Sequence, residues 1–301
     1  MKGSAQIQFK ECAECQRERK ERNRVLVNLD DARVRDAKFV NAPAIFPIND
    51  IKYEVTKKRA GIFAASKGEA ITWSPAKDCP SSAVLSDKPN IVEEKLGWLQ
   101  RHDKDCGSLY GMLPLVVGMP VALADHIDRN PEKNLLRGRI GHIISWTLDE
   151  REDSVFHDNK RILRYLPAVV LVQFTERVRV NDEWVEKPCN WTVDGIDRPG
   201  VYPIFPCRRH WFLDERRKPP KLRVIRHQLP LVPAYAMTAH CAQGRTLPAA
   251  IIDLQIGRGV NGIASYVAMT RVRKKTDRLI FRPFDREVFA AGSPLGPFFF
   301  A

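Results

Sequence analysis

The chain has 301 residues, 44% of them hydrophobic and 28% charged, a composition that excludes a disordered protein and allows two domains with separate cores. The 49 Lys and Arg residues exceed the 36 Asp and Glu residues, which gives a net charge of +13. This excess favours a polyanionic partner such as nucleic acid, although charge alone fits an ordinary basic protein equally well.

The N-terminus and the cysteines indicate an intracellular protein. The sequence begins MKGSAQIQFKE, which is polar and unlike a secretory signal, and its seven cysteines are scattered and odd in number. We therefore expect reduced thiols. The longest apolar run, residues 113–124, holds two prolines and is too short to span a bilayer, so we expect no membrane partner.

Residues 1–37 form a charged segment in which we expect a helix from about 11 to 35. Cys12 and Cys15 form a single CxxC there. A zinc site needs four ligands, no second pair lies at a matching distance, and His102 and Cys106 are isolated. An exposed charged helix with two free thiols is therefore favoured over a metal site.

The next segment alternates strand and helix signals. An apolar strand is predicted around residues 44–46, and Asn49 and Asp50 then provide side chains that can cap a helix start. The basic triplet at 57–59 in this helix is either a solvated face or a phosphate contact. The predicted apolar face consists of Ile51, Val55, Ile62 and Phe63. A short strand, a loop and a helix are expected at residues 69–73, 75–90 and 91–102.

From residue 111 onward, short apolar runs recur between turns and charge clusters. This pattern predicts a small antiparallel barrel or sandwich that is inserted into, or appended to, an α/β domain. The expected strands lie at residues 119–124, 139–146, 168–174, 201–205 and 222–225.

A strongly basic stretch ends this region. Trp211 and Phe212 lie within it, and they either stack on bases or belong to the core of a barrel strand. For the cations, a nucleic-acid surface is the favoured interpretation because Lys and Arg bind phosphates. The basic residues are Arg208, Arg209, His210, Arg216, Arg217, Lys218, Lys221, Arg223 and Arg226.

Residues 233–284 read as strand, helix, strand. The run at 249–254 predicts a buried strand, 263–273 an apolar-faced helix that ends in cations, and 278–284 a second strand. This order is typical of a parallel sheet, in which ligands gather at the strand ends. The polar residues at these turns are Thr238, His240, Gln243, Gly244, Thr246 and Arg271.

Two motifs in this stretch resemble a known family. TAHCAQGRT (residues 238–246) resembles motif V of the PIF-type (petite integration frequency), RecD-like superfamily 1B DNA helicases, and YVAMTRVR (266–273) resembles their motif VI. The resemblance extends over most of residues 40–285. It includes QLPLVPAYAMT, which leads into motif V, and PAIFPINDIKYEVTKKRA, which resembles the region around motif IV. It also includes LPLVVGMPVAL and LLRGRIGHI, which resemble the strands that open the family's inserted β-barrel.

The resemblance implies an α/β fold, in which a RecA-like parallel sheet domain carries an inserted small antiparallel β-barrel. The second RecA-like domain of a helicase would comprise residues 38–117 and 227–287. The barrel would comprise residues 118–226, and residues 288–301 would form a tail.

The resemblance also implies roles for the turn residues. Arg271 would reach the γ-phosphate of ATP, and Gln243 and Gly244 would sense the nucleotide. Thr238 and His240 would contact the DNA backbone, with Arg208, Arg209, Arg216 and Arg217 as further DNA contacts. Alternatives remain for three residues: His240 as a helix-capping or core histidine, Arg271 as the partner of a carboxylate, and Tyr266 as core packing.

The chain departs from the family in two ways. Cys241 stands where motif V usually has a lysine, and no G-x-x-x-x-G-K-[ST] loop or acidic Mg²⁺-binding motif occurs in the sequence. We therefore expect the C-terminal motor half of an ATP-dependent DNA helicase. It would be inactive alone, and it would use ATP and Mg²⁺ only with the missing first RecA-like domain.

The resemblance implies single-stranded or forked DNA as partner, 5′-to-3′ movement, and genome maintenance such as DNA repair, recombination or telomere maintenance. Both a nuclear and a mitochondrial location fit. Two alternatives remain open: a non-enzymatic nucleic-acid-binding remnant of a helicase, and an interaction scaffold that uses the charged N-terminal segment.

Overall fold

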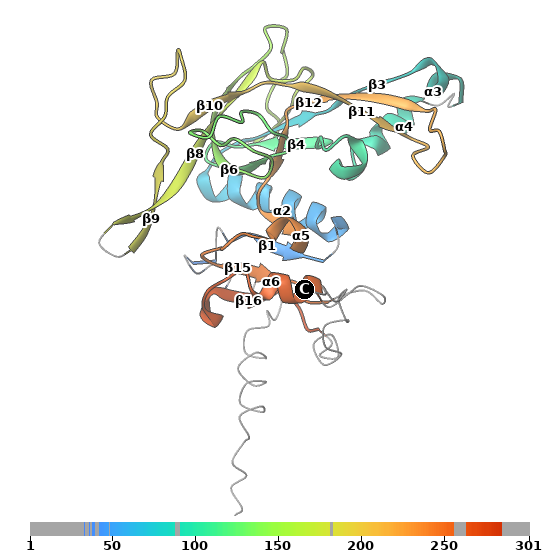
Figure 1. The fold of residues 1–301 in the computed structure, drawn as a ribbon. Helices are drawn as coiled ribbons and strands as arrows, with labels where there is room; N and C mark the ends of the chain where they lie inside the picture. Colours follow the sequence, from blue (N-terminus) through green and yellow to red (C-terminus); the bar gives the residue numbers. More distant parts are fainter. Residues whose placement is uncertain are drawn as a thin grey trace, which may run out of the picture. The chain divides into compact units, whose positions relative to one another are not determined.

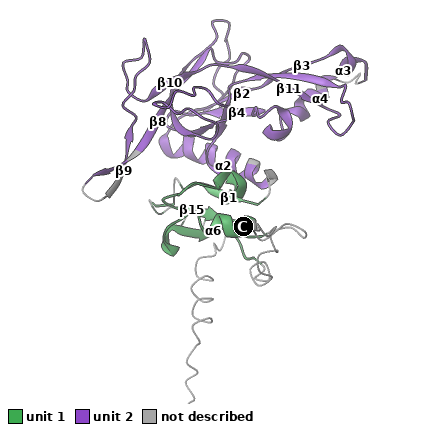
Figure 2. Ribbon diagram, in the orientation of Figure 1, with its two compact units in different colours: residues 1–48, 237–301 green, residues 49–236 purple. Residues whose placement is uncertain are grey.

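The computed structural model describes residues 33, 36, 38–39, 42–47, 49–87, 91–180, 183–255 and 263–284. The helix expected at 11–35 (apart from position 33), Cys12 and Cys15, and the tail at 288–301 lie outside these residues. The chain forms two compact units (Figures 1 and 2). Unit 1 comprises residues 1–48 and 237–301, and unit 2 comprises residues 49–236.

Unit 1 is built on a four-stranded sheet in the order β14-β1-β15-β16. Strand β1 pairs in parallel with β15, and β15 pairs in parallel with β16. The side chains of β1 and β15 are buried throughout, as the apolar sequences of strands inside a parallel sheet require. The strands are β1 (Ala44–Phe46), β14 (Ala236–Thr238), β15 (Ala250–Ile252) and β16 (Arg278–Ile280).

The strand-helix-strand prediction for unit 1 is confirmed, with shorter elements than expected. Helix α6 (Ile263–Met269) lies between β15 and β16 in the sequence, followed by the 3₁₀ turn η3 (Lys275–Asp277). A four-residue helix, α5 (Ala239–Ala242), comes directly after β14 and packs against α6.

The predicted antiparallel β module is present in unit 2. Its six-stranded sheet has the order β10-β8-β6-β5-β13, with β9 paired to β8. A register shift between Ile143 and Ser145 lets β6 bend against β8. The strands are β5 (Pro120–Leu123), β6 (Ile140–Thr147), β8 (Val169–Val180), β9 (Glu183–Pro188), β10 (Val201–Ile204) and β13 (Leu231–Pro233).

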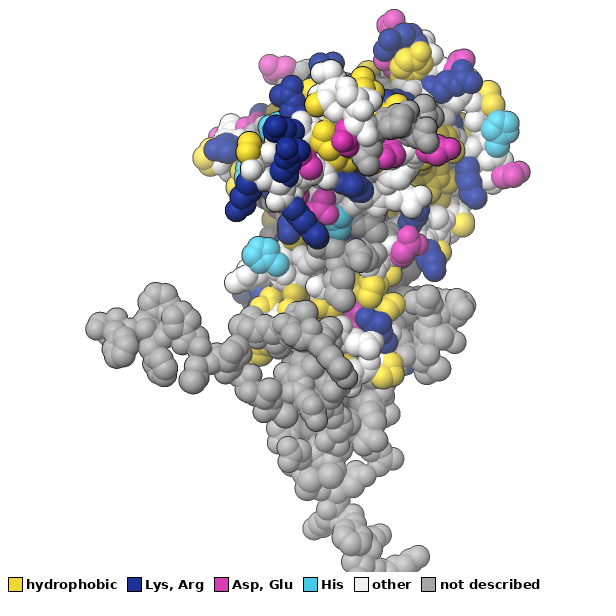
Figure 3. Space-filling view, turned by 90° about the vertical axis from the view of Figure 1, so that its right-hand side faces the viewer, with side chains coloured by type: hydrophobic (Ala, Val, Ile, Leu, Met, Phe, Trp, Pro, Cys, Tyr) yellow, Lys and Arg dark blue, Asp and Glu magenta, His cyan; other side chains and the backbone are white. Residues whose placement is uncertain are grey.

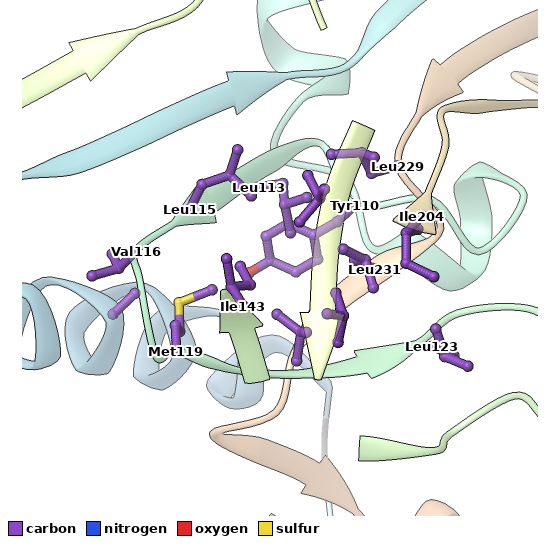
Figure 4. Packing of buried hydrophobic residues seen from close by; sticks show 14 of the residues in the cluster. Tyr110, Leu113, Leu115, Val116, Met119, Leu123, Ile143, Ile204, Leu229 and Leu231 are labelled. Atoms are coloured by element: carbon purple, nitrogen blue, oxygen red, sulfur yellow. The ribbon is translucent and has the colours of Figure 1, made fainter. Parts of the chain in front are cut away.

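The main core of unit 2 lies between this sheet and a smaller one. Strands β4 (Met112–Leu115), β2 (Ile71–Pro75) and β7 (Lys160–Ile162) form the smaller sheet. Buried side chains from both sheets surround the Tyr110 ring, as Figure 4 shows. The long helix α2 (Asn49–Lys67) adds Ala60 and Ala64 to the same cluster.

The prediction that Ile62 belongs to the apolar face of α2 is wrong. Thr56, Ala60 and Ala64 are buried at a spacing of four, so the stripe that faces the core runs through them. Ile62 lies two residues from both Ala60 and Ala64, about 200° around the helix, and is 67% exposed.

A third sheet, in the order β11-β12-β3, corrects two further predictions. Residues 75–90 are not a loop, because β3 (Lys77–Pro80) and α3 (Ser82–Asp87) lie there. The strand expected at 222–225 does not join the six-stranded sheet. It is β12 (Arg223–Gln228), which pairs with β11 (Cys207–Phe212) and β3. Helix α4 (Ile91–Trp98) and the 3₁₀ turn η2 (Asp103–Cys106) complete unit 2.

The two units divide the chain at other positions than the domains implied by the resemblance. Residues 49–117 belong to the same compact unit as the β module. The domain limits at 38, 117, 227 and 287 stay a prediction. None of the described helices combines the length and hydrophobicity needed to cross a membrane.

Candidate nucleotide and DNA site

The turn after β14 is organised by Thr238. This residue is the N-cap of α5, and its Oγ1 accepts a hydrogen bond of 3.3 Å from the Cys241 N–H. A hydroxyl that accepts still keeps its own O–H as a donor. Thr238 can therefore fix the start of α5 and donate to a phosphate oxygen at the same time.

Helix α5 ends at an exposed, glycine-dependent turn. Gln243 is the C-cap, and its N–H donates to the His240 carbonyl at 3.2 Å. Gly244 comes next with φ +76°, a conformation that residues with a side chain rarely adopt. Apart from its two neighbours in the chain, no described residue has an atom within 4 Å of the position that a Cβ would take. Gln243 and Gly244 are both exposed. A ligand can therefore approach this backbone closely.

Arg271, just after α6, is held by neutral oxygen atoms. Its Nε donates to the Val267 carbonyl at 2.7 Å, one Nη to the Thr270 hydroxyl at 2.7 Å, and the other to the Arg245 carbonyl at 3.4 Å. Among the described residues no carboxylate forms an ion pair with Arg271, so the alternative of a structural ion pair has no support there. No described carboxylate offsets the charge of the guanidinium, and two of its five N–H donors have no acceptor among these bonds.

The backbone ties the two predicted motifs together. The Leu247 N–H donates to the Arg271 carbonyl at 2.7 Å, and Leu247 forms a parallel bridge with Val272. The Arg271 side chain bonds back to Arg245. The structure therefore brings Arg271 to the turn that contains Gln243 and Gly244.

The remaining residues of the two motifs lie at the surface. His240 is exposed, so its alternative as a core histidine is wrong, and Thr238 rather than His240 caps α5. Cys241 and Thr246 are also exposed. Tyr266 is 65% exposed, so the expectation that it packs in a core is wrong: it lies on the face of α6 opposite to the buried Ala268.

The sequence analysis missed an ion pair between Asp253 and Arg282 at the carboxyl end of β15. The Asp253 side chain is fully buried and accepts from Nε and Nη2 of Arg282 at 3.0 and 2.8 Å. It also accepts from the Gln255 N–H at 3.0 Å. The signal in the sequence is an acidic residue that directly follows a buried strand.

The basic stretch does not form one surface. Arg226 is fully buried and binds Asp78 through two bonds of 2.9 and 2.7 Å, as well as the carbonyls of Trp98 and Leu109. Its place in the predicted nucleic-acid surface is therefore wrong. The reason is that Asp78 lies opposite Arg226 on β3, a neighbour that the sequence does not reveal.

The arginines that the resemblance implies as DNA contacts lie on β11 or in the loop that follows it. Arg208, Arg209, Arg216 and Arg217 are all exposed, and Arg209 also pairs with Asp125. Trp211 is a core residue that packs edge-on against Trp98 with ring centroids 5.6 Å apart. The core interpretation thus holds for Trp211, and Phe212 is half-buried.

The basic triplet of α2 also divides. Lys57 and Lys58 are exposed, but the Arg59 guanidinium lies 5.3 Å from the centre of the Tyr235 ring and donates to the Tyr235 carbonyl at 3.4 Å. Burial lowers the pKa of Arg59. Arg59 is therefore a packing residue. In the described ranges, no group of three or more His, Cys, Asp or Glu side chains could hold a metal ion.

No protein-family model and no curated protein matches the sequence. Among solved structures, the chain is similar to Pif1 helicase from Candida albicans, with 16% identity and a TM-score of 0.47 over 83% of this chain and 49% of that one. It is also similar to a Pif1 helicase whose structure describes DNA unwinding at forked dsDNA by two coordinating Pif1 helicases. That match has 16% identity and a TM-score of 0.45, and it covers 84% of this chain and 42% of that one. Unliganded Pif1 from Bacteroides sp matches with 15% identity, a TM-score of 0.37, and coverage of 80% and 51%.

Other matches are Bacteroides Pif1 in complex with ADP-AlF4 and Bacteroides Pif1 bound to ssDNA. These are the helicases that motifs V and VI indicated. The chain spans about half the length of these structures.

Proposed function

We propose that the chain is the C-terminal motor half of an ATP-dependent DNA helicase. The observation that carries this proposal is the contact between the Arg271 guanidinium and the carbonyl of Arg245, in the turn that also holds Gln243 and Gly244. A helicase couples a nucleotide to a nucleic acid through one connected piece of protein, and this contact connects the two candidate ligand positions.

The nucleotide side consists of Arg271 and the Gly244 turn. A guanidinium whose partners are uncharged oxygens can neutralise the charge that develops on a transferred phosphoryl group. The exposed backbone at Gly244 can approach a phosphate. Within the proposal, ATP and Mg²⁺ are held mainly by a first RecA-like domain, and this chain contributes the arginine.

The DNA side consists of Thr238 and His240, at the start of the same short helix. The Thr238 O–H and the exposed His240 ring can both donate to phosphate oxygens of a single strand. Helix α5 spans only four residues, so DNA contacts at its start lie one turn from the nucleotide-facing turn at its end. A shift of the strand would therefore be felt at Gln243 and Gly244.

A test joins the chain to a first RecA-like domain that carries a phosphate loop and measures steady-state ATP turnover with single-stranded DNA. Arg271→Ala should lower kcat by about 10³-fold or more, and Arg271→Lys should restore little, because the planar fork is lost. Arg273→Ala is the matched control: it removes an exposed arginine two residues away and should leave kcat unchanged. Equal turnover in the Arg271 and Arg273 variants would refute the proposed role.

The chain by itself should bind single-stranded DNA and hydrolyse no ATP, since its sequence contains no phosphate loop. If the joined protein also fails to hydrolyse ATP while DNA binding persists, the alternative of a non-enzymatic nucleic-acid-binding remnant is favoured. If DNA binding is absent, or does not weaken with salt, both nucleic-acid functions fail.

A further inference from the structure

The sheet β11-β12-β3 has one buried and one open face. Side chains alternate along each strand, and every second residue of β12 (Val224, Arg226, Gln228) is buried. The intervening positions form the open face, and the strand register aligns them in two rows across the sheet. These rows are Arg208–His227–Lys77 and His210–Ile225–Cys79, with Phe212 opposite Arg223 at the end.

The open face is positively charged and carries no acidic residue. Asp78 is the one acidic residue in the three strands, and it lies on the buried face with Arg226. Arg208, Arg223 and Lys77 are exposed on the open face. Beside Arg208, burial and that positive charge both lower the pKa of His227. A polyanion matches this face.

The loop between β11 and β12 extends the positive charge. Its exposed cations are Arg216, Arg217, Lys218 and Lys221, beside the acidic Asp214 and Glu215. The Asp214 carboxylate is occupied by the backbone N–H groups of Lys221 and Leu222. Figure 3 views the side on which β3 and β11 lie in Figure 1, and dark blue Lys and Arg side chains gather on the upper part of that view.

Aromatic rings lie among these cations. The His210 and Phe212 rings are neighbours on one face of β11, with centroids 6.0 Å apart and planes at 78°. The exposed His210 and half-buried Phe212 offer ring surface to a ligand, whereas Trp211 points into the core. Rings between cations suit a ligand that alternates flat bases with phosphates.

We propose that the open face of this sheet binds a single nucleic-acid strand, with bases against Phe212 and His210 and phosphates against Arg208, Arg223 and Lys77. The proposal deepens the proposed function and rests on it, because it adds a DNA contact in unit 2 to the contacts of Thr238 and His240 in unit 1. Single strands are favoured over duplex because only unpaired bases expose their faces for stacking. The open face of β11 from Arg208 to Phe212 is roughly 14 Å long, at 3.4 Å per residue.

Fluorescence anisotropy with a labelled 15-nucleotide oligothymidine probe, titrated at several salt concentrations, tests the proposal. Phe212→Leu should weaken binding about 5- to 160-fold, the range for loss of one stacked base. Phe212→Tyr keeps an aromatic face and should bind like the unmodified chain. Arg208→Gln should lower the slope of log K against log salt by about 0.7.

Arg164→Gln is the matched control, because it removes an exposed arginine of the same unit that lies outside this sheet. It should leave the affinity within about twofold. An oligonucleotide with 5-iodouracil gives a second readout in the unmodified protein, since light should cross-link it to the peptide that contains His210 and Phe212. Thermal melts identify any variant that fails to fold.

Three outcomes overturn the proposal. In the first, Phe212→Leu leaves the affinity for oligothymidine unchanged. In the second, Phe212→Leu lowers the affinity for a blunt-ended duplex as much as the affinity for oligothymidine. In the third, cross-links form only outside residues 207–228. If oligothymidine binds but responds only to Thr238→Val and His240→Ala, this inference fails and the proposed function stands. If the unmodified chain does not bind oligothymidine, the proposed DNA function fails as well. Tight binding of poly-glutamate instead of oligothymidine would assign the face to an acidic protein.

Discussion

The ion pair of Arg226 and Asp78 gives the sharpest test of the structure, because it turns a predicted DNA contact into a core element. The two side chains are 0% and 3% exposed, and their nearest nitrogen and oxygen are 2.7 Å apart. Arg226 also donates to the carbonyls of Trp98 and Leu109 at 2.8 and 3.3 Å. Removing the guanidinium therefore leaves a buried carboxylate and two carbonyls without these donors.

Arg226→Met should lower the free energy of unfolding by about 3 to 5 kcal/mol, the usual effect of removing one partner of a buried ion pair. At about 2 to 4 °C per kcal/mol for a unit of this size, the melting temperature should fall by roughly 6 to 20 °C. Asp78→Asn should have a similar effect. The double variant Arg226→Met, Asp78→Leu should recover much of the loss, because it leaves no buried charge unpaired.

Urea unfolding followed by circular dichroism measures these differences. The matched control is Arg164→Met, which breaks the ion pair between Arg164 and Asp153, whose side chains are 69% and 66% exposed. An exposed pair contributes about 0 to 1 kcal/mol, so this variant should unfold almost like the unmodified chain. If Arg226→Met is as stable as Arg164→Met, or if it selectively weakens DNA binding without loss of stability, the buried-pair assignment is refuted.

Three further predictions concern single residues. Gly244→Val should lower stability by about 1 to 3 kcal/mol because φ is +76° there, and Gly244→Asn should lower it less, which thermal melts compare. Thr238→Ala should cost about 0.5 to 2 kcal/mol through loss of the α5 cap, whereas Thr238→Ser should keep it, as urea titrations will show. Burial raises the pKa of Glu152, but hydrogen bonds from Ser154 and Tyr165 outweigh it and lower the pKa to about 2. Since that lies below the ordinary value, the stability advantage over Glu152→Gln should be full above about pH 5 and vanish as pH falls toward 2, measured by unfolding at pH 7, 4 and 2.

Strand β15 of the parallel sheet and helix α2 of unit 2 were predictable because their signals are local. Residues 249–254 form an unbroken apolar run bounded by turns, and Asn49 and Asp50 mark a helix start. Each pattern depends on neighbours in the sequence, so β15 and α2 appear where expected. The Ile62 error has a different origin: Ile62 lies about 200° around the helix from the buried stripe, and only packing decides which side of α2 meets the core.

The third sheet was not predictable because its partners are distant in sequence. Strand β3 has the sequence KDCP, which reads as a turn, and it is a strand only because β12 pairs with it from about 150 positions further along the chain. The same pairing places Asp78 beside Arg226. A cation within a basic run looks like every other cation until its neighbour across the sheet is known.

Within the candidate site, the sequence could indicate the residues but not the contact between them. Arg271 and Arg245 are 26 positions apart, and the bond uses the carbonyl of Arg245 rather than its side chain. Backbone acceptors leave no trace in residue types. The departure at Cys241 also becomes clearer: its N–H donates to Thr238, so the exposed thiol changes the surface at this position without altering the capping bond.

The arrangement of this turn bears on how two ligands could be coupled. The cap at Thr238 fixes the start of α5, the bond from Gln243 to His240 fixes its end, and bonds with Arg271 fix the residues from Arg245 to Leu247. The first two links are local, the third joins Arg245 to Arg271 from 26 positions away, and all three involve backbone atoms, so the segment resists bending. A contact at Thr238 or His240 would then displace Arg271 with the turn as one piece, whereas a flexible turn would absorb the shift. A motor requires this rigidity if a step along DNA is to change the position of an arginine at a phosphate.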